Sequence, residues 1–292
     1  MRHGIVILPQ QRWADARATW QRAEELGFDH AWTYDHLSWR SLAGEPWGAT
    51  IPTLTAAAAV TSTIRLGTFV SSPNFRHPVP FAKDLATLDD VSGGRFLLGV
   101  GSGGTGFDAF VLGQEQLSAR ERHDRFIEFV RGLDALLRFE EPGSGGISFR
   151  GDWFTAHEAR MVGTPAQHPR MPFVVAADGP KGLRFVAELA DGWVTLGRES
   201  DNLDAWWASV SNLSRRLDDA LAARGRDAGT LDRYLSLDSH GYALASVDAW
   251  EDAIGRAAEL GFTDVVTHWP RAEGVYAGSD DVLVEVASRL RP

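Results

Sequence analysis

Eight short apolar runs alternate with eight longer helical stretches, and this alternation constrains the fold of the chain more than any other feature. The runs are apolar on both faces, as parallel strands covered by helices are. The expected strands are His3–Leu8, Ala31–Asp35, Arg65–Ser71, Phe96–Gly101, Pro172–Ala177, Gly192–Leu196, Tyr234–Ala243 and Asp264–Trp269. The expected helices are Ala14–Leu26, Ile51–Thr61, Pro80–Val91, Ala119–Phe139, Gly182–Leu189, Leu203–Arg224, Val247–Leu260 and Asp280–Leu290. Eight of each predicts an α/β fold of the TIM (β/α)₈ barrel type, which typically needs about 250 residues. The 292-residue chain is therefore expected to form one barrel domain over residues 1–292.

An internal repeat supports this alternation. The sequence Arg22–Phe28 recurs with one change as Arg256–Phe262. Each copy has the pattern of a helix end, a glycine C-cap and an apolar residue that opens the next strand. Short loops of this kind converge on similar sequences in many α/β proteins, and they favour right-handed βαβ units.

Three irregular segments interrupt the pattern. The segments after the second and fourth strands, His36–Thr50 and Ser102–Ser118, are long, and in a barrel such segments build the active site. The stretch 140–171 is rich in Gly and Pro, and Ile147–Arg150 with Trp153–His157 predicts a small hairpin inside it. We interpret this stretch as an insertion on the barrel rather than a second domain.

Composition excludes several functional classes. A net charge of −10 argues against nucleic acid or an anionic membrane as the main partner. The absence of cysteine excludes disulfides, iron–sulfur clusters and Cys-containing zinc sites, and the histidines lack metal-ligand spacing, so no metal is expected. The apolar run Gly4–Leu8 is too short for a signal peptide or membrane span. We therefore expect a soluble cytoplasmic protein.

A glycine-rich segment follows the fourth strand. Gly99–Gly104 fits G-x-G-x-x-G, but a dinucleotide-binding motif must open a helix at once. The next helix signal here is the capping box Ser118–Glu121. A loop whose backbone N–H groups face a ligand at a barrel strand end therefore fits better than a dinucleotide motif or a merely flexible loop.

A second candidate binding segment, Ala176–Lys181, follows the fifth strand and leads into a helix. Asp178 is suited to cap that helix and Pro180 to its first turn. Free N–H groups at a helix start attract anions such as phosphate. An ordinary βα turn with a capping Asp explains the segment better when it is taken alone.

Asp35 and His36 end the second strand, and Trp39 follows them. A histidine at the carboxyl end of a barrel strand is well placed as a general base near neutral pH, and Asp35 would orient it. The alternative is a purely structural histidine. His77, directly before Pro78, is interpreted as a residue that fixes a loop.

Taken in order and spacing, these motifs resemble the luciferase-like monooxygenase superfamily of flavin- and deazaflavin-dependent oxidoreductases. The resemblance runs from the first strand to the last helix. It rests on Tyr34–His36, Ile64–Thr68, Phe75–Pro78, Leu88–Arg95, Leu98–Gly103, Ala176–Lys181 and Ala190–Trp193.

The resemblance implies a bacterial-luciferase-like TIM barrel with an insertion, often dimeric, that holds a flavin or deazaflavin ring at its mouth. The segment after the third strand would pass behind the ring, commonly with a non-prolyl cis peptide. Two further segments would hold the ribityl chain and phosphate. The cofactor-binding residues that the resemblance implies are Phe69, Val70, Ser72, Gly101, Ser102, Gly103, Gly104, Ala177, Asp178, Gly179, Pro180 and Lys181.

His36 and Trp39 resemble the substrate-side pair of deazaflavin-dependent sugar-phosphate dehydrogenases, in which the histidine takes the alcohol proton. Trp39 is one residue nearer to the histidine than in that pattern, and Gly104 stands where an acidic residue is expected. The chain has only two lysines, Lys83 and Lys181, so a lysine clamp for a sugar phosphate has no evident counterpart.

The leading hypothesis is hydride transfer that depends on coenzyme F420, to or from a small organic substrate. His36 would be the general base or acid, Asp35 would orient it and Trp39 would line the substrate pocket. The first alternative is an FMN-dependent monooxygenase that uses reduced flavin and oxygen. The second is a non-catalytic flavin-binding protein.

Overall fold

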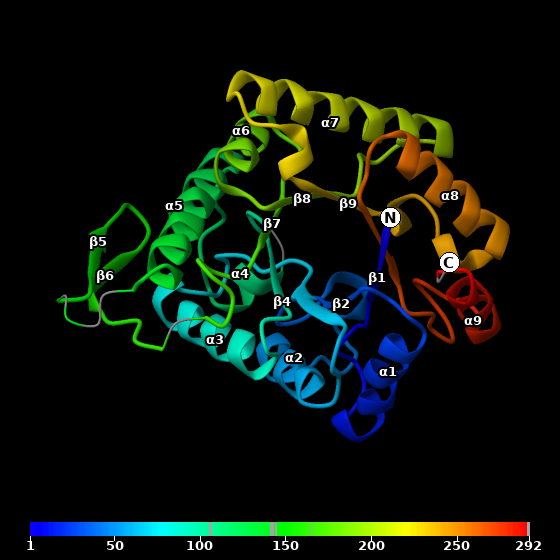
Figure 1. Ribbon diagram of the computed structural model, residues 1–292, viewed down its shortest axis with the longest axis horizontal. Helices are drawn as coiled ribbons and strands as arrows, with labels where there is room; N and C mark the ends of the chain where they lie inside the picture. The colour runs from blue at the N-terminus through cyan, green and yellow to red at the C-terminus, as the bar shows by residue number, and fades with distance from the viewer. Residues whose placement is uncertain (105–106, 141–142, 144, 164, 291–292) are drawn as a thin grey trace.

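Eight parallel strands close into a barrel in the spatial order β1-β10-β9-β8-β7-β4-β3-β2, which confirms the predicted fold (Figure 1). The computed structural model describes residues 1–104, 107–140, 143, 145–163 and 165–290. The barrel strands are β1 Arg2–Val6, β2 His30–Thr33, β3 Arg65–Thr68, β4 Phe96–Val100, β7 Phe173–Ala176, β8 Gly192–Thr195, β9 Asp232–Ser236 and β10 Asp264–His268.

Helices surround the barrel on all sides in Figure 1. The longer ones are α1 Trp13–Glu25, α2 Thr50–Ala58, α3 Pro78–Val91, α5 Ala119–Leu137, α6 Pro180–Leu189, α7 Leu203–Ala223, α8 Val247–Glu259 and α9 Asp280–Ser288. Short helical elements are α4 Phe107–Val111, η1 Arg40–Leu42, η2 Ala228–Thr230, η3 Leu237–Ser239 and η4 Ala243–Ala245. Among the described helices none is long and apolar enough to cross a membrane.

The strand predicted over Tyr234–Ala243 is too long. Strand β9 ends at Ser236, and the chain turns into η3 and then η4. Asp238 fixes this turn, because its carboxylate accepts hydrogen bonds from the backbone N–H of Ala243 (2.8 Å) and of His268 (2.7 Å). An apolar run that continues past a strand end cannot reveal such a turn.

The barrel interior is packed with side chains rather than open. Trp32 and Tyr234 fill it edge to face, with ring centroids 5.8 Å apart. Gly67 of β3 leaves room for the indole, because a Cβ there would lie 2.3 Å from the Trp32 ring. Filled interiors of this kind leave the ends of the strands as the places where a ligand can bind.

The predicted hairpin is present beside α5 and projects from the barrel (Figure 1). It consists of β5 Ile147–Arg150, as predicted, and β6 Thr155–Ala159, which begins two residues later than predicted. Glu128 of α5 accepts the backbone N–H groups of Asp152 and Phe154 and so joins the hairpin turn to the barrel. Residues 141–142, 144 and 164 of the predicted insertion lie outside the described residues.

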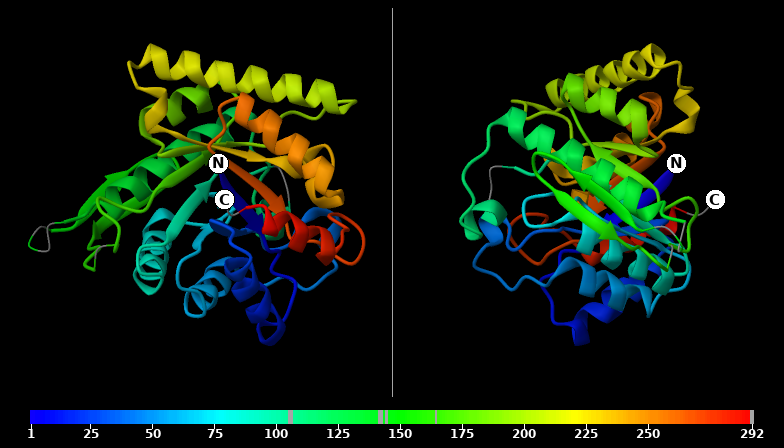
Figure 2. Two further views of the ribbon diagram at one scale, coloured as in Figure 1. Left: turned by 45° about the vertical axis from the view of Figure 1, so that its right-hand side comes forward. Right: turned by 90° about the vertical axis from the view of Figure 1, so that its left-hand side faces the viewer.

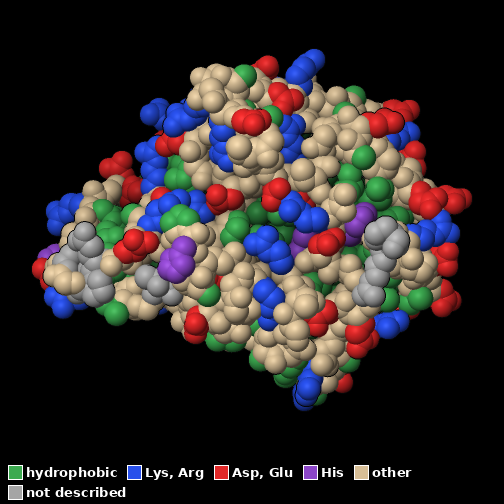
Figure 3. Space-filling model, viewed as in Figure 1, with side chains coloured by type: hydrophobic (Ala, Val, Ile, Leu, Met, Phe, Trp, Pro, Cys, Tyr) green, Lys and Arg blue, Asp and Glu red, His purple; other side chains and the backbone are tan. Residues whose placement is uncertain are grey.

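The two ends of the barrel are distinct. The N-terminus leads directly into β1, so the amino ends of the strands lie on the side where Figure 2 shows the N-terminus. Figure 3 shows this face, where basic and acidic side chains are interspersed. The carboxyl ends, and the long segments that follow them, form the mouth on the opposite side.

Candidate active site

Four neighbouring strands, β2, β3, β4 and β7, bring the predicted site residues to one side of the mouth. The segments that follow these strands are Tyr34–Trp39, Phe69–Asn74, Gly101–Gly104 and Ala177–Lys181, in that order. Because carboxyl ends of parallel strands meet at one barrel rim, segments from distant parts of the sequence form one surface.

His36 forms a hydrogen-bonded pair with Asp108 of α4. The His36 Nδ1 lies 2.7 Å from the Asp108 Oδ2, and the other carboxylate oxygen accepts the backbone N–H of Leu37 at 2.7 Å. Asp108 is buried, whereas the His36 side chain is 28% exposed. An ionised carboxylate only accepts, so Nδ1 carries the proton, and in the neutral imidazole Nε2 then keeps its lone pair.

The sequence interpretation missed Asp108, although a signal was present. An acidic residue is expected directly after the glycine-rich segment, at the place where Gly104 stands. Asp108 lies only four positions further on. The short helix α4 carries its carboxylate back to the histidine.

The expectation that Asp35 orients His36 is wrong. Both Asp35 oxygens are bound by the Arg76 guanidinium, at 2.7 Å from Nε and 2.6 Å from Nη2. Successive residues of an extended chain point to opposite sides, so neighbours such as Asp35 and His36 do not face each other. Asp35, which is 1% exposed, is instead a structural link between the segments that follow β2 and β3.

Trp39 belongs to an aromatic wall at the mouth. Its ring lies 5.2 Å from that of Tyr34, and Trp47 packs 6.4 Å from the same tyrosine ring. These side chains share one apolar cluster with Phe69 and Val70. The substrate side and the cofactor side predicted from the sequence therefore share one continuous surface.

The segment after β3 contains the non-prolyl cis peptide that the resemblance implies, between Phe69 and Val70. The backbone that follows is tied to β4, because Ser71 N–H donates to the Gly99 carbonyl and Gly101 N–H donates to the Ser71 carbonyl, both at 2.8 Å. A Cβ on Gly101 would lie 2.9 Å from Val70 Cγ2. Glycine is therefore required here for packing against Val70. Ser72, the next predicted residue, is buried.

The described part of the glycine-rich loop is held by Asn74. Gly103 has φ of +71°, and a Cβ there would lie 2.7 Å from the Asn74 amide atoms. The Asn74 amide donates to the Gly104 carbonyl at 3.3 Å and accepts from the Arg125 Nη2 at 2.6 Å. The neighbouring Ser102 is partly buried. A merely flexible loop does not describe this arrangement.

The turn before α6 differs in one detail from the prediction. Gly179 is the N-cap and no side chain caps the helix, while Pro180 occupies the first turn as expected. Asp178 instead accepts a hydrogen bond from the Thr195 hydroxyl at 2.7 Å. Burial raises the pKa of the Asp178 carboxyl, and the Thr195 hydrogen bond opposes this shift only in part.

The start of α6 offers an anion a cationic surrounding. Gly179, Pro180 and Lys181 are exposed, while the Ala177 carbonyl is held by the Trp193 indole N–H at 2.7 Å. Burial lowers the pKa of His123; the Asp124 charge opposes this shift, and the positive charges of Lys181 and Arg184 add to it. These positive charges and the free N–H groups of a helix start suit a phosphate.

Unpaired buried polar atoms gather at the mouth. Among the described residues, five buried side-chain atoms lack a hydrogen-bond partner: His3 Nδ1, Ser38 Oγ, Trp47 Nε1, Ser71 Oγ and Arg125 Nε. Four of them belong to segments that follow β2 and β3 or to the arginine that binds Asn74. Buried polar groups are nearly always paired in proteins, so this cluster suits a bound polar ligand.

A second histidine–aspartate pair, which the sequence analysis missed, lies at the carboxyl end of β10 beside Tyr34. His268 Nδ1 is 2.7 Å from the Asp238 carboxylate, and His268 Nε2 is 2.7 Å from the Tyr34 hydroxyl. Tyr276 stacks on His268 with ring centroids 3.6 Å apart. Burial raises the pKa of Tyr34, which keeps its hydroxyl protonated and hydrogen-bonded.

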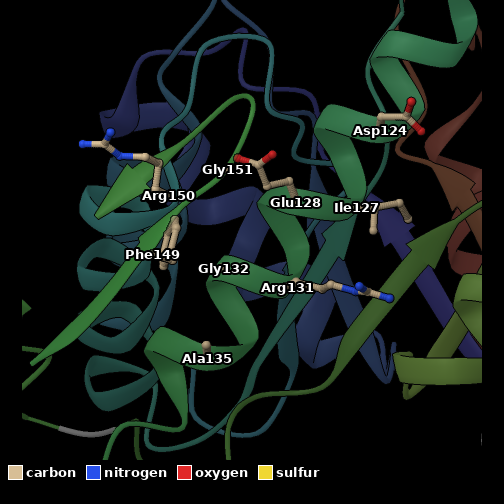
Figure 4. Close-up of a pocket in the computed structure, with 9 residues that line it drawn as sticks. All are labelled: Asp124, Ile127, Glu128, Arg131, Gly132, Ala135, Phe149, Arg150 and Gly151. Carbon is tan, nitrogen blue, oxygen red and sulfur yellow. The ribbon is translucent and has the colours of Figure 1, made fainter. Parts of the chain in front are cut away.

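A groove of about 450 Å³ lies away from the mouth, between α5 and the hairpin (Figure 4). Glu128, Gly132, Phe149 and Arg150 line it, and the Glu128 carboxylate is occupied by the backbone of the hairpin turn. It is therefore a joint between two elements and not part of the site. The described residues contain no group of three His, Asp or Glu side chains that could hold a metal ion.

The comparisons with known proteins agree with this geometry. Residues 1–275 match the family described as luciferase-like monooxygenase. An F420-dependent hydroxymycolic acid dehydrogenase from Mycobacterium tuberculosis is 32% identical over 99% of this chain and 72% of its own length. An F420-dependent glucose-6-phosphate dehydrogenase from Amycolatopsis mediterranei is 34% identical over 59% of this chain and 50% of its own length.

A solved F420-dependent secondary alcohol dehydrogenase, in complex with an F420-acetone adduct, has the same fold. It superposes with a TM-score of 0.81 at 19% identity and covers 100% of this chain and 99% of its own. Together with the matched family, the barrel and the rim segments that its motifs form establish that this chain belongs to the luciferase-like monooxygenase family.

Proposed function

We propose that this protein is an oxidoreductase that uses coenzyme F420 to transfer a hydride to or from a small organic substrate. The observation that carries the proposal is the His36–Asp108 pair, which lies on the same rim as the cis Phe69–Val70 segment and the glycine-rich loop. Two relatives, one similar over 99% of this chain and one over 59%, are named as F420-dependent dehydrogenases. Their names support this choice of cofactor.

The residues at the rim fit a deazaflavin. Phe69, Val70 and Ser72 would lie behind the ring, and Gly101 to Gly104 would pass along the ribityl chain. The start of α6, with Lys181, would hold the phosphate. The unpaired Ser71 hydroxyl supplies a hydrogen-bonding group at the ring segment. When bound, the coenzyme supplies a ring carbon that accepts or donates a hydride.

His36 handles the substrate proton in this proposal. Its Nε2 lone pair takes the proton from a substrate hydroxyl during oxidation and returns it during reduction of a carbonyl. Asp108 fixes the tautomer and stabilises the imidazolium that forms. A positioned general base of this kind typically contributes about 10²- to 10⁴-fold in rate.

The substrate is a small organic alcohol, carbonyl compound or activated alkene. Trp39, Tyr34 and Trp47 give its pocket an aromatic wall. Lys83 donates to the backbone carbonyl of Val162, away from the mouth, so Lys181 is the only lysine of the chain at the rim. The lack of a lysine clamp disfavours a sugar phosphate.

The test is a titration of the purified protein with coenzyme F420 and with FMN, each oxidised and reduced, followed by ring fluorescence or absorbance. Tight binding of coenzyme F420 with negligible binding of FMN is the expected result. Preference for reduced FMN, together with oxygen consumption, would replace the proposal with the monooxygenase alternative. Binding without any coenzyme-dependent turnover over a panel of alcohols and carbonyls would favour a non-catalytic binding protein.

Two further expectations stay predictions. A homodimer is implied by the family resemblance, and light scattering of the purified protein measures it directly. A cytoplasmic location is checked by fractionation of the source cells, and the acidic composition argues against nucleic acid or an anionic membrane as the main partner.

A further inference from the structure

A small pocket lies behind the glycine-rich loop, on the side of α5. It has a volume of about 100 Å³, which suits one compact polar group. Its polar lining comes from Asn74, the Gly104 backbone, Gln114, the exposed Glu115, Gln116, Arg122 and Arg125. No residue of this pocket was predicted from the sequence as a binding residue except Gly104.

Arg125 is the unusual member of the pocket. It is 7% exposed, and its Nε has no hydrogen-bond partner. Its two other nitrogens bind only neutral acceptors, the Asn74 Oδ1 at 2.6 Å and the Gln114 Oε1 at 3.3 Å. Arg122 donates to the Leu117 carbonyl. In the described part of the chain, neither arginine has a carboxylate within ion-pair distance.

The other two buried arginines of the described residues both have carboxylate partners, which Arg125 lacks. Arg170 pairs with Asp134 and Asp191, each at 2.5 Å, and Arg233 pairs with Asp218. A buried cation without a counter-charge is unfavourable, because desolvation is not compensated. Burial and the neighbouring Arg122 both lower the pKa of Arg125, which agrees with two cations that lack an anion between them.

We propose that this pocket is an anion site that binds a carboxylate, with Arg125 as its buried anchor and Arg122 as its outer cation. The Arg125 Nε is the free donor, and a guanidinium matches the planar shape of a carboxylate. With Glu115 in the lining, the two arginines leave the pocket a net charge of one positive unit. Gly104 of the glycine-rich loop also lines the pocket.

Two molecules could supply this carboxylate. One is coenzyme F420, whose side chain ends in carboxylates, and this source rests on the proposed function. The other is a substrate that carries its own carboxylate. The site itself does not depend on which of them is correct.

The experiment compares the wild-type protein with Arg125→Gln and Arg122→Gln, with Arg120→Gln as the matched control. Arg120 lies on the same helix, is 82% exposed and pairs only with Asp124. One arm titrates coenzyme F420 and its deazaflavin nucleoside, which lacks phosphate and carboxylates. The other arm measures thermal stabilisation by sodium acetate against sodium chloride, with and without coenzyme.

If the coenzyme fills the pocket, Arg125→Gln weakens its binding about tenfold or more, as loss of a charge-assisted pair does. The nucleoside then binds the variant and the wild type equally. If a substrate carboxylate fills it, coenzyme affinity is unchanged and acetate stabilises the wild type but not the variants. Arg122→Gln shows the same direction more weakly, and it keeps the test valid if Arg125→Gln does not fold.

Equal coenzyme binding and equal response to acetate in all four proteins would overturn the anion site. The anion site would also be overturned if Arg120→Gln weakened coenzyme binding and abolished stabilisation by acetate in the same way. A general loss of positive charge would then explain the data. Failure of the wild type to bind coenzyme F420 would count against the proposed function. The acetate experiment without coenzyme would still show whether the pocket binds a carboxylate.

Discussion

The two ends of the barrel differ in how far their buried polar groups are paired in hydrogen bonds. At the amino end, Asp264 is fully buried and accepts hydrogen bonds from Arg2 (2.7 and 2.6 Å), His30 (3.0 Å) and Thr263 (2.6 Å). His30 in turn accepts the indole N–H of Trp32 at 2.6 Å. Among the described residues, four buried polar atoms at the carboxyl end have no partner, one of them on Arg125, which also has no counter-ion, whereas at the amino end only His3 Nδ1 is unpaired.

The difference separates stability from function. The hydrogen-bond network around Asp264 is complete within the protein, because each of its donors has an acceptor. It therefore contributes to stability without a ligand. The open groups at the mouth are unfavourable in the free protein, at about 1–3 kcal/mol for each unsatisfied group, and become favourable only when a ligand pairs them. The comparison predicts that substitutions at the amino end change the free energy of unfolding, whereas substitutions at the mouth change binding and turnover.

The largest expected effect is on turnover at the mouth. His36→Ala is expected to lower kcat by about 10²- to 10⁴-fold, because the substrate proton loses its acceptor. Coenzyme affinity stays unchanged, since His36 is not assigned to cofactor binding. Steady-state kinetics with the alcohol or carbonyl that turns over measures the effect. His157→Ala, an exposed histidine on the hairpin, is the control, and equal kcat in both variants would remove His36 from the mechanism.

At the amino end, Asp264→Asn is expected to lower the free energy of unfolding by about 1–3 kcal/mol, because the buried His30 and the half-exposed Arg2 lose their charged acceptor. Coenzyme affinity of the folded protein does not change. Urea denaturation and a coenzyme titration measure the two quantities. Asp232→Asn removes the exposed partner of the same Arg2 and costs at most about 1 kcal/mol. A large loss of coenzyme affinity in Asp264→Asn would break the separation between the two ends.

The Asp108→Asn variant sharpens the comparison within the mouth. It is expected to lower kcat by about 10- to 10²-fold, as removal of a partner that orients a histidine commonly does, with little change in stability. Asp35→Asn is the matched variant. Asp35, which follows β2, is a buried aspartate like Asp108, but it pairs with Arg76 and not with a histidine. It lowers stability, while the turnover of the folded fraction is retained. The reverse outcome would restore Asp35 as the orienting residue.

The barrel could be predicted from the sequence because its signal is distributed over the whole chain. Eight apolar runs with short αβ connections leave few alternatives, and single errors in a strand boundary do not alter the topology. The placement of Phe69, Gly101 and Gly179 at one rim follows from the same regularity, since the segments after parallel strands meet there.

Side-chain partners could not be predicted in the same way. Asp35 is adjacent to His36 in the sequence, yet the extended chain directs it to Arg76, which lies 41 positions away. Asp108 reaches His36 from a distance of 72 positions. Such pairs depend on three-dimensional contacts between segments of irregular structure, for which the sequence contains no periodic signal.

Acid titration gives a smaller effect of opposite sign at the two ends. Burial alone would raise the pKa of Asp264, but hydrogen bonds from His30 and Arg2 lower it to about 2. Because its folded-state pKa lies below the unfolded value of 3.8, Asp264 stabilises the fold above pH 3.8. This contribution, about 2 kcal/mol, is lost as the pH falls toward 2.

Asp178 at the mouth behaves in the opposite way, because burial raises its pKa. Its contribution to stability is present at low pH and is lost as the pH rises through the folded-state pKa. We therefore expect Asp178→Asn to be more stable than the wild type near neutral pH. The difference between Asp264→Asn and the wild type should shrink between pH 4 and pH 2. Denaturation of the three proteins from neutral pH down to about pH 2 checks both signs, and a constant difference for Asp264→Asn would contradict the assigned network.

The smallest expected effect isolates one unpaired atom. Ser71 and Thr68 are both buried hydroxyl residues of the segment around β3, but the Thr68 hydroxyl donates to the Gly99 carbonyl at 2.7 Å, whereas the Ser71 hydroxyl has no partner. Thr68→Val is expected to cost about 1 kcal/mol of stability and to leave coenzyme affinity unchanged. Ser71→Ala removes a group that is unsatisfied in the free protein, so stability is unchanged or slightly higher. Its coenzyme affinity falls by about 0.5–1.5 kcal/mol, because the hydroxyl finds its partner only in the complex. If Ser71→Ala lost stability and kept its affinity, the open polar atoms of the mouth would have to be explained without a ligand.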